Sequence, residues 1–353
     1  MTSRPADSPV SRREFLVRQA LFGLSCGIAR PLLGDESPTA APSTATAATE
    51  TSVARGLTWL ATRQRDDGSF GSGGYLGNVA VTALAGMALT AAGNNPGRGL
   101  YGATLDRTVG FLLDHARPSG FIIVEDAASH GPMYGHGFAT LFLSESYGMT
   151  QRADIRSKLS HAVELIIGSQ NDQGGWRYHP VRRDADVSVT ICQIMALRAA
   201  RNAGLFVPRK TVDRCIDYVK RCQNPDGGFR YMLEGGQSAF ARSAAGVVAL
   251  YNAGIYRGPE IQNGLNYVMR FLPGEKAAER TSHFFYGHYY AIQAMWQAGD
   301  AYWQAWHPAI QQALLERQRK DGAWSDPICA EYGTAMALLV LQMPNRLLPI
   351  FQK

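Results

Sequence analysis

Residues 169–204 read SQNDQGGWRYHPVRRDADVSVTICQIMALRAARNAG, and the fold follows from this stretch. It joins a glycine-rich turn, a loop with basic and acidic residues, and an apolar helix that ends at a glycine. The turn recurs, each time as a glutamine, then a pair that contains glycine, then an aromatic residue. The four copies are QRDDGSF from Gln64, QNDQGGW from Gln170, QNPDGGF from Gln223 and QRKDGAW from Gln318. The recurrence of one turn predicts a repeat protein.

Two kinds of helical pattern alternate along the chain. Helices with one polar face are expected at 53–64, 104–116, 155–169, 211–223, 259–271 and 307–318. Helices that are apolar on all sides are expected at 78–93, 135–148, 187–204, 239–254, 287–299 and 331–343. A helix that is apolar on every side is normally buried. The two kinds therefore predict buried helices covered by amphipathic ones.

The ends of the apolar helices set the period of the repeat. Pro344 ends the last one, because proline cannot continue a helix. The other five end at glycines, the preferred residue after a helix C-terminus: Gly93, Gly148, Gly204, Gly254 and Gly299. The ends fall roughly 45 to 56 residues apart, which is typical of an array of helical hairpins. Six such hairpins predict an all-α (α/α)6 toroid, a double ring with the apolar helices inside.

Composition limits the classes of partner. Apolar residues make up 46% of the 353 residues and charged residues only 18%, which suits helices buried on both sides. The net charge is +6, but the basic residues are scattered. We therefore expect no nucleic-acid partner and only a mild preference for anionic ligands or lipid surfaces. No segment is long and apolar enough to be expected to span a membrane.

The N-terminus resembles an export leader. Residues 11–16 read SRREFL, which matches the twin-arginine pattern, and a short apolar run at 20–29 follows. Residues 36–51 are rich in Ala, Thr, Ser and Pro, the composition of a flexible linker. We expect residues 1–51 to be leader and linker, and residues 52–353 to form one toroid domain. The protein is then exported to the periplasm or beyond the cytoplasmic membrane, with association to the membrane surface left open.

The glutamine turns resemble the QW-type repeats of the squalene cyclase and protein prenyltransferase β-subunit superfamily. The resemblance covers about residues 52–345 and implies an (α/α)6 toroid. It says little about the reaction, because one fold hosts many functions. We expect the turn residues to be architectural. Each glutamine amide is expected to bond free backbone N–H groups at the start of the next helix, and each aromatic side chain to pack on a neighbouring hairpin.

Asp184 and Asp186 resemble the first two acidic positions of the D-x-D-D-T-A stretch in class II terpene cyclases. In that family the middle aspartate protonates an alkene or an epoxide, so the resemblance implies Asp186 as the acid. Val187 stands where the last aspartate is expected and Ser188 replaces the threonine. The alternative is that Asp186 only caps the following helix.

Two further motifs precede opposite inner helices of the predicted ring. Residues 129–136 read SHGPMYGH and residues 282–288 read SHFFYGH. We take His136 and His288 as candidate catalytic residues, too far apart to share one metal ion. The alternative is a pair of repeat-specific loops held by hydrogen bonds. The candidate substrate-binding residues from these motifs are Tyr134, Tyr286 and His283.

No metal or other cofactor is expected. His288 resembles the zinc-ligand histidine of protein prenyltransferase β-subunits, but the family's Asp-x-Cys is missing. The matching place, from Glu234, reads EGGQSAF. A zinc site is therefore unsupported. The arginines near the inner-helix N-termini would instead suit a diphosphate, a carboxylate or an acidic glycan, and the candidates are Arg182, Arg183 and Arg242. The alternative is that they are ordinary solvated arginines.

Three functions remain open, and the sequence does not decide whether the chain is an enzyme. The first is a terpene cyclase-like isomerase or transferase acting on, or binding, an isoprenoid or another apolar ligand. The second is a non-catalytic scaffold for a protein, lipid or glycan partner. The third is a polysaccharide lyase or hydrolase. An aromatic-lined cavity favours the first, a flat polar rim the second and an open groove the third.

Overall fold

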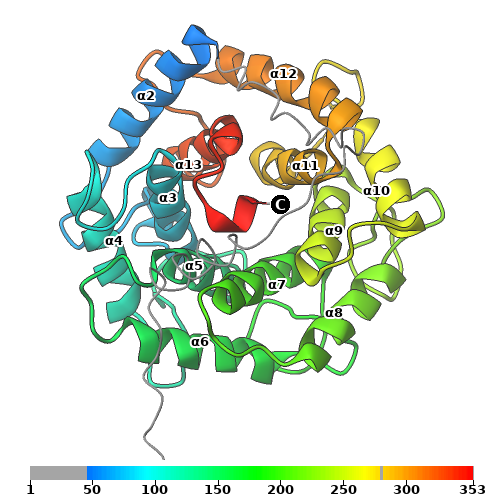
Figure 1. The fold of residues 1–353 in the computed structure, drawn as a ribbon, viewed down its shortest axis with the longest axis horizontal. Helices are drawn as coiled ribbons and strands as arrows, with labels where there is room; N and C mark the ends of the chain where they lie inside the picture. The colour runs from blue at the N-terminus through cyan, green and yellow to red at the C-terminus, as the bar shows by residue number, and fades with distance from the viewer. Residues whose placement is uncertain (1–45, 279–280, 353) are drawn as a thin grey trace, which may run out of the picture. The chain divides into compact units, whose positions relative to one another are not determined.

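The computed structural model describes residues 46–278 and 281–352. The twin-arginine motif, Cys26 and nearly all of the expected linker lie outside these residues. Within them the chain forms twelve α-helices and no strand, arranged as two concentric rings (Figure 1). The expected (α/α)6 toroid is therefore confirmed.

The outer helices are α2 (Ala47–Thr62), α4 (Gly102–Asp114), α6 (Ile155–Ser169), α8 (Arg209–Arg221), α10 (Pro259–Met269) and α12 (Asp300–Arg317). The inner helices are α3 (Val79–Ala91), α5 (Pro132–Ser146), α7 (Val187–Asn202), α9 (Phe240–Ala253), α11 (Phe284–Ala298) and α13 (Ala330–Leu341). Each inner helix packs against the next, and α13 packs against α3, so the inner ring is closed. Nearly every residue of α3 and α13 is buried, whereas α8 buries a single stripe.

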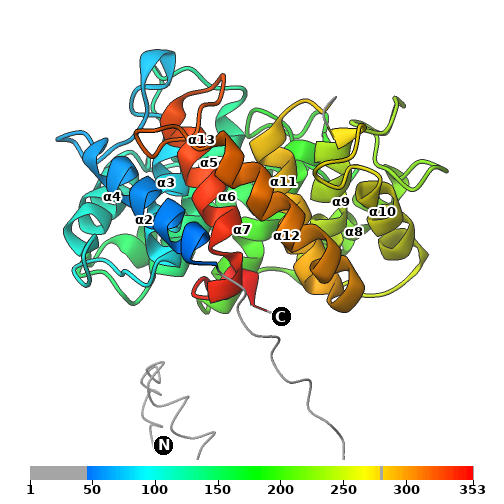
Figure 2. The same cartoon turned by 90° about the horizontal axis from the view of Figure 1, so that it is seen from above.

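The inner helices run parallel to one another. At their N-terminal ends, Gly135 of α5 lies against Val79 of α3, and Gly287 of α11 against Phe240 of α9. At the other end, the Gln342 amide that follows α13 donates to the Ala88 carbonyl of α3. We call the end with the inner-helix N-termini the upper rim and the opposite end the lower face. The C-terminus lies at the lower face (Figure 2).

The glutamine turns join successive outer helices. The Gln170 amide nitrogen donates to the carbonyls of Gly174 (2.8 Å) and Thr211 (2.9 Å), the latter in the first turn of the next outer helix. We expected the glutamine side chain to accept hydrogen bonds from backbone N–H groups, and this expectation is wrong: the side-chain NH2 donates to backbone carbonyls instead. An NH2 group carries two donors, so it can hold its own turn and the neighbouring helix together.

The last copy of this turn closes the outer ring. Gln318 donates to the Ser52 carbonyl of α2 (2.9 Å) and accepts from the Ser52 hydroxyl (2.8 Å). Residues more than 260 positions apart in sequence are thereby joined. Closure leaves no end that a capping repeat would have to cover.

The turn aromatics are architectural as expected. The Trp176 side chain is buried, and its indole N–H donates to the Ile166 carbonyl at 2.7 Å. Its backbone N–H donates to the Thr190 hydroxyl of α7 at 3.1 Å. Thr82, Ser243 and Thr334 hold the other three turn aromatics in the same way. A hydroxyl in the first turn of the inner helix is thus part of the repeat.

Several boundaries differ from the expected ones. Helix α2 begins at Ala47 rather than Val53, because the Thr46 hydroxyl caps it by accepting the Thr49 N–H. Residues 47–51 are therefore helix and not linker. Helix α12 begins at Asp300 rather than His307. The expected terminal glycines do hold, since all five have positive φ.

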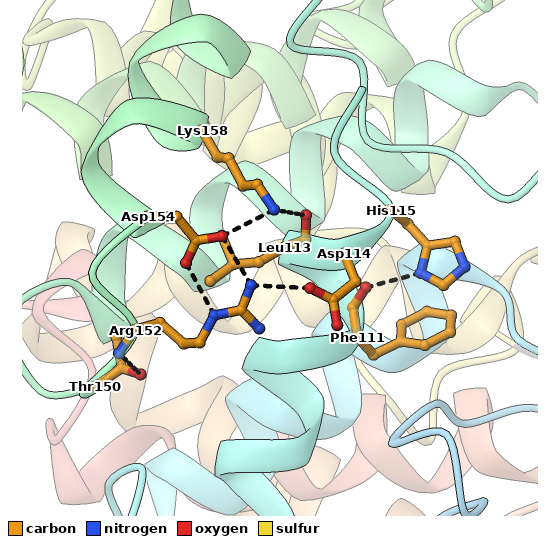
Figure 3. Close-up of polar contacts among 8 residues, drawn as sticks. All are labelled: Phe111, Leu113, Asp114, His115, Thr150, Arg152, Asp154 and Lys158. Carbon is orange, nitrogen blue, oxygen red and sulfur yellow. Dashed lines mark hydrogen bonds and ion pairs between the residues drawn. The ribbon is translucent and has the colours of Figure 1, made fainter. Parts of the chain in front are cut away.

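An ion-pair network joins the two outer helices α4 and α6 (Figure 3). Arg152 bonds Asp114 at the end of α4 (2.8 Å) and Asp154 before α6 (2.7 Å). Lys158 reaches Asp154 at 2.8 Å and also donates to the Leu113 carbonyl. Cations at the end of one helix and a carboxylate before the next complement both helix dipoles.

Two further features concern the cysteine side chains and the length and hydropathy of the helices. Cys192, Cys215, Cys222 and Cys329 are free buried thiols. Among the helices that the structure describes, none is long and apolar enough to cross a membrane.

Candidate active site

Asp186 is held by the local structure of its repeat. Its backbone N–H donates to the Trp176 carbonyl at 3.0 Å, which ties the residue to the glutamine turn. Its Oδ1 accepts the Val189 N–H at 2.8 Å and caps α7. The expected capping role is therefore present. It occupies one carboxylate oxygen and leaves the other for chemistry.

The second oxygen of Asp186 is buried without a hydrogen bond. The side chain has no solvent exposure, and Oδ2 has no hydrogen-bond partner within the described part of the chain. Burial raises the pKa of Asp186 to about 6, against a usual value of 3.8. The Val189 N–H, Arg177 and Tyr231 oppose the rise. A buried carboxyl with such a raised pKa keeps its proton up to about pH 6.

Arg177 lies between Asp186 and a second carboxylate. Its Nε is 3.9 Å from Asp186 Oδ2, whereas its Nη1 is 2.5 Å from Asp184 Oδ2. The Asp184 side chain is half exposed and Asp186 is fully buried. The shorter ion pair of Arg177 is therefore with the solvent-exposed Asp184. The negative charge of an ionised Asp186 is only weakly compensated by Arg177. The structure brings Asp184 and Asp186 together at one guanidinium.

Tyrosines surround this carboxyl at the upper rim. Tyr178 and Tyr231 share a hydrogen bond between their hydroxyls, and the Arg177 guanidinium lies 5.0 and 5.8 Å from their ring centres. Tyr134 is 6.3 Å from Tyr178, centre to centre. Burial, with Asp186 nearby, raises the pKa of the Tyr134 hydroxyl well above 10. The Tyr134 and Tyr231 phenols therefore stay neutral, and the three tyrosines offer aromatic faces beside the acid.

Tyr286 reaches this group from α11, the second inner helix along the ring from α7. Its hydroxyl donates to the Ser188 carbonyl of α7 at 2.9 Å. Below it, Tyr290 contacts the Cys192 thiol at 3.4 Å, and both Tyr289 and Tyr290 are fully buried. Aromatic side chains therefore fill the ring below Tyr286. Tyr134 and Tyr286 both lie near Asp186.

His136 and His288 are not part of this group. Each follows a Tyr-Gly pair, and a helix turns successive side chains by about 100°, so the histidine points away from the ring axis when the tyrosine points toward it. His136 Nδ1 accepts the Ile122 N–H, and its Nε2 bonds the Ala162 carbonyl of the outer helix α6. His288 lies among Phe240, Phe284 and Trp306. Burial lowers their pKa values to about 4 and about 3.

The basic and remaining rim residues are spread out. Arg182 and Arg183 are exposed, and Arg182 donates to the Gly168 carbonyl. Arg242 is partly buried at the start of α9 and donates to the Phe229 carbonyl. Burial lowers the pKa of the Arg242 guanidinium. The groups that act on it electrostatically, Tyr267 and Tyr231, are phenols and not carboxylates. His283 is exposed and adopts a left-handed conformation before α11 (φ 58°).

Sequence reasoning missed Asp326. Burial raises its pKa, and its Oδ1 accepts the Ile328 N–H. It stands two residues after the turn aromatic Trp324, as Tyr178 and Tyr231 stand two residues after Trp176 and Phe229. Counting two positions on from each turn aromatic would have found these rim residues. Over the described residues, no group of three His, Cys, Asp or Glu side chains could hold a metal ion.

Comparison with known proteins places the chain in a family. The model of the prenyltransferase alpha-alpha toroid domain matches residues 43–229 and 134–272. The chain is 27% identical over 184 residues to a drimenyl diphosphate synthase of Streptomyces showdoensis, covering 51% of the chain and 32% of that protein. A second drimenyl diphosphate synthase, of Streptantibioticus cattleyicolor, is 33% identical over 88 residues (25% of the chain, 16% of that protein). The chain thus spans about a third or less of the curated relatives it matches.

Solved structures share the fold at low identity. The type II terpene cyclase MstE of Scytonema, in complex with merosterolic acid A, superposes with a TM-score of 0.61 at 15% identity, covering 86% of this chain and 98% of that one. An α-1,6-mannanase of Salegentibacter superposes with a TM-score of 0.59 at 8% identity, covering 84% and 99%. Because the family model covers well over half of the sequence, and because the glutamine turns form the closed double ring, the chain belongs to the prenyltransferase alpha-alpha toroid domain family.

Proposed function

We propose that this protein is a terpene cyclase-like enzyme that protonates an isoprenoid, with Asp186 as the acid. One observation carries the proposal. Asp186 is fully buried, its Oδ1 is fixed by the Val189 N–H, and its Oδ2 has no hydrogen-bond partner in the described regions. A carboxyl that serves only as a helix cap does not need a second oxygen buried among aromatic rings.

The chemistry follows from this placement. Oδ2 gives its proton to one carbon of a substrate double bond. The π electrons form the new C–H bond, and the other carbon becomes positively charged. The faces of Tyr134, Tyr178, Tyr231 and Tyr286 lie around the acid, and an aromatic face stabilises a cation. The π electrons of a second double bond attack this cation and close a ring, which moves the positive charge to a further carbon. Loss of a proton from that cyclised cation ends the reaction, and Asp186 takes a new proton from solvent.

The substrate has to enter from the upper rim. Tyr134, Tyr178, Tyr231 and Tyr286 are all partly exposed there, whereas Tyr289 and Tyr290 fill the axis below. A chain that reaches deeper has to break the contact between the Tyr286 hydroxyl and the Ser188 carbonyl. The related drimenyl diphosphate synthases and the substrate complexes of the structural neighbour favour an isoprenoid.

The test is product analysis with purified full-length protein. Farnesyl diphosphate, geranylgeranyl diphosphate and squalene are incubated separately, and organic extracts are examined by gas chromatography with mass spectrometry. We expect a cyclic isomer or hydrate of at least one substrate, with a rate that falls above pH 6 as Asp186 ionises. Asp186→Asn keeps the helix cap and is expected to abolish the product. Product formation that survives Asp186→Asn would refute the role of Asp186.

A hydrolase is the second candidate, because Asp326 is a further half-buried carboxyl with a raised pKa at the same rim. It belongs to the repeat opposite that of Asp186, and opposite inner helices of such a ring are on the order of 16–20 Å apart. Glycosidases hold their two carboxylates within about 10 Å. Asp326→Asn is therefore the matched control, since it should spare cyclisation. Release of sugar from α-1,6-mannan that depends on both aspartates would favour the hydrolase.

We also propose that the protein is exported by the twin-arginine route. The support is the SRREFL motif at residues 11–16. A reporter fused after residue 51 should cross the cytoplasmic membrane, and Arg12→Lys with Arg13→Lys should retain it inside. Export of both fusions alike would contradict the proposal.

A further inference from the structure

Two contacts reach through the interior of the ring from α11 to α7, although α9 lies between these helices and packs against both. The Tyr286 hydroxyl donates to the Ser188 carbonyl at 2.9 Å. The Tyr290 hydroxyl lies 3.4 Å from the Cys192 thiol. On each helix the two residues are four positions apart, so the second contact lies about 6 Å further from the upper rim than the first. We call these contacts the upper crossing and the lower crossing.

The upper crossing can open at little cost in hydrogen bonds. The Tyr286 side chain is partly exposed, so water can replace Ser188 as the partner of its hydroxyl. Ser188 lies in the first turn of α7, and its carbonyl keeps the hydrogen bond that it accepts within the helix. The exchange of a protein partner for water changes the free energy of the structure only modestly. The upper crossing is therefore a contact that can break and re-form.

The lower crossing is closed much more firmly. The Tyr290 ring packs edge-on against the rings of Tyr286 and Tyr289, with 4.8 Å between ring centres in both pairs. Tyr289 in turn lies 6.3 Å from Phe138 of α5 and 6.2 Å from Phe351 near the C-terminus, again between ring centres. Tyr290, Tyr289, Phe138 and Phe351 are all buried. Movement of Tyr286 therefore gives access to the interior as far as Tyr290 and no further.

We propose that Tyr286 is a gate, and that its opening forms a chamber between Asp186 and Tyr290 in which the middle of an isoprenyl diphosphate folds. The inference rests on the proposed function, from which it takes the isoprenoid. It adds the place where that substrate binds, because aromatic side chains fill this interior while the gate is closed. A ligand that binds only the open conformation makes that conformation the dominant one.

The two ends of such a substrate stay at the upper rim. Its terminal double bond has to meet Oδ2 of Asp186, which precedes the first turn of α7. Its diphosphate is charged and cannot leave water without a large cost. Only the apolar middle of the chain can move inward, and Tyr286 stands at the start of that path. The aromatic ring of Tyr290 and the thiol of Cys192 then form walls that suit a hydrocarbon chain.

Cys192 reports the state of the gate, because its buried thiol lies 3.6 Å from the Ser188 carbonyl that Tyr286 bonds. The experiment measures how fast N-ethylmaleimide labels each cysteine of the full-length protein, read by peptide mass spectrometry. A buried thiol is labelled only while the structure around it is open. Tyr286→Phe keeps the aromatic ring and removes the hydroxyl of the upper crossing. We expect it to raise the labelling rate of Cys192 roughly 2- to 10-fold.

Two controls separate the gate from general loosening of the fold. Cys215 is fully buried in the outer helix α8, so its labelling rate in the same sample reports opening of the whole structure and should not change. Tyr302→Phe is the matched variant, because it removes a hydroxyl that joins two outer helices by donating to Asn266 at 3.2 Å. It should leave the labelling rate of Cys192 unchanged.

Substrate protection tests the chamber. Farnesyl diphosphate and geranylgeranyl diphosphate are added in turn to Asp186→Asn, which is expected not to convert them. At least one of them should slow the labelling of Cys192 and not that of Cys215, whereas inorganic diphosphate alone should slow neither.

The outcomes distinguish this inference from the proposed function. The gate is overturned if Tyr286→Phe labels Cys192 no faster than wild type and Tyr302→Phe do. The chamber is overturned if wild type cyclises either diphosphate while Cys192 stays unprotected in Asp186→Asn. Absence of both product and protection would refute the proposed function together with the substrate named here, while the labelling rates of Tyr286→Phe still decide the gate.

Discussion

Arg177 lies 3.9 Å from the Asp186 carboxylate through Nε but only 2.5 Å from Asp184 through Nη1. The guanidinium of Arg177 is thus paired mainly with Asp184, whose side chain is also exposed to solvent. Asp186 keeps a raised pKa beside an arginine, because burial outweighs the remaining attraction. We therefore expect Asp184, although it is exposed, to hold the Arg177 guanidinium away from Asp186.

Ionisation of Asp186 should destabilise the fold. Its pKa is about 6 in the folded chain, above the value of 3.8 expected when unfolded, so the folded state binds the proton more tightly. The stabilising contribution is present below pH 4 and is lost as the pH rises through 6. The shift corresponds to about 3 kcal/mol. Asp186→Asn should therefore raise the free energy of unfolding at pH 8 and lose this advantage by pH 4. Urea unfolding of wild type and Asp186→Asn at pH 4 and pH 8 measures this effect. A difference in free energy of unfolding between the two proteins that is the same at both pH values would contradict the prediction.

Removal of Asp184 should lower the pKa of Asp186. In Asp184→Asn the guanidinium of Arg177 loses its close anionic partner and is free to compensate Asp186. An opposite charge at this range lowers a carboxyl pKa by about 1 unit or more. The pKa of Asp186 is obtained by measuring the free energy of unfolding against pH for Asp184→Asn and for the double variant that also carries Asp186→Asn. The difference between the two curves changes at the pKa of Asp186. Asp213→Asn is a suitable control, because Asp213 pairs with Arg209 far from the site.

His136 and His288 occupy matching positions in the Tyr-Gly-His motifs, yet their replacement should have different effects. His136→Leu leaves the Ile122 N–H and the Ala162 carbonyl without their partner, which costs about 2–4 kcal/mol. His288 Nδ1 has no hydrogen-bond partner in the described parts of the chain. His288→Leu should therefore change the free energy of unfolding by about 1 kcal/mol or less. Equal losses in denaturant melts would show that His288 has a partner.

The sequence was a good guide to the fold because the signals of the turn are local. A glutamine, a glycine and an aromatic residue determine each connection, and Gly254, for example, ends α9 in the left-handed conformation that its position requires. The acid could also be found, since Asp186 lies within one recognisable motif. The rest of the site depends on how repeats meet. Tyr286 reaches Ser188 across the ring, nearly 100 residues away, and the direction of His136 depends on helical phase. Neither follows from local pattern.

The Arg152 network should contribute less at low pH. Hydrogen bonds from Arg152, then from Lys158, hold the pKa of Asp154 well below 3.8. Because this pKa is lower in the folded state, the stabilisation is present above pH 4 and is lost as the pH falls further. The side chain is 38% exposed, so solvent limits the effect to about 1 kcal/mol. Asp154→Asn should be less stable than wild type at pH 7 in urea unfolding, with the gap closing toward pH 2. A gap that widens would exclude the ion pair as its cause.

Gln318 should matter more for α2 than its equivalents matter for their own neighbours. Gln318→Ala removes the bonds to Ser52 that close the outer ring, whereas Gln64→Ala removes the matching bond to Thr104 inside the chain. Each loss costs about 1–2 kcal/mol. In Gln318→Ala this cost falls on α2, the first helix among the described residues, which follows no other helix of the ring in sequence. Amide hydrogen exchange in α2 should therefore accelerate roughly 5- to 30-fold. In Gln64→Ala the neighbouring α4 stays flanked on both sides and should exchange more slowly than α2 does. Equal acceleration of α2 and α4 would mean that the ring does not depend on this closure.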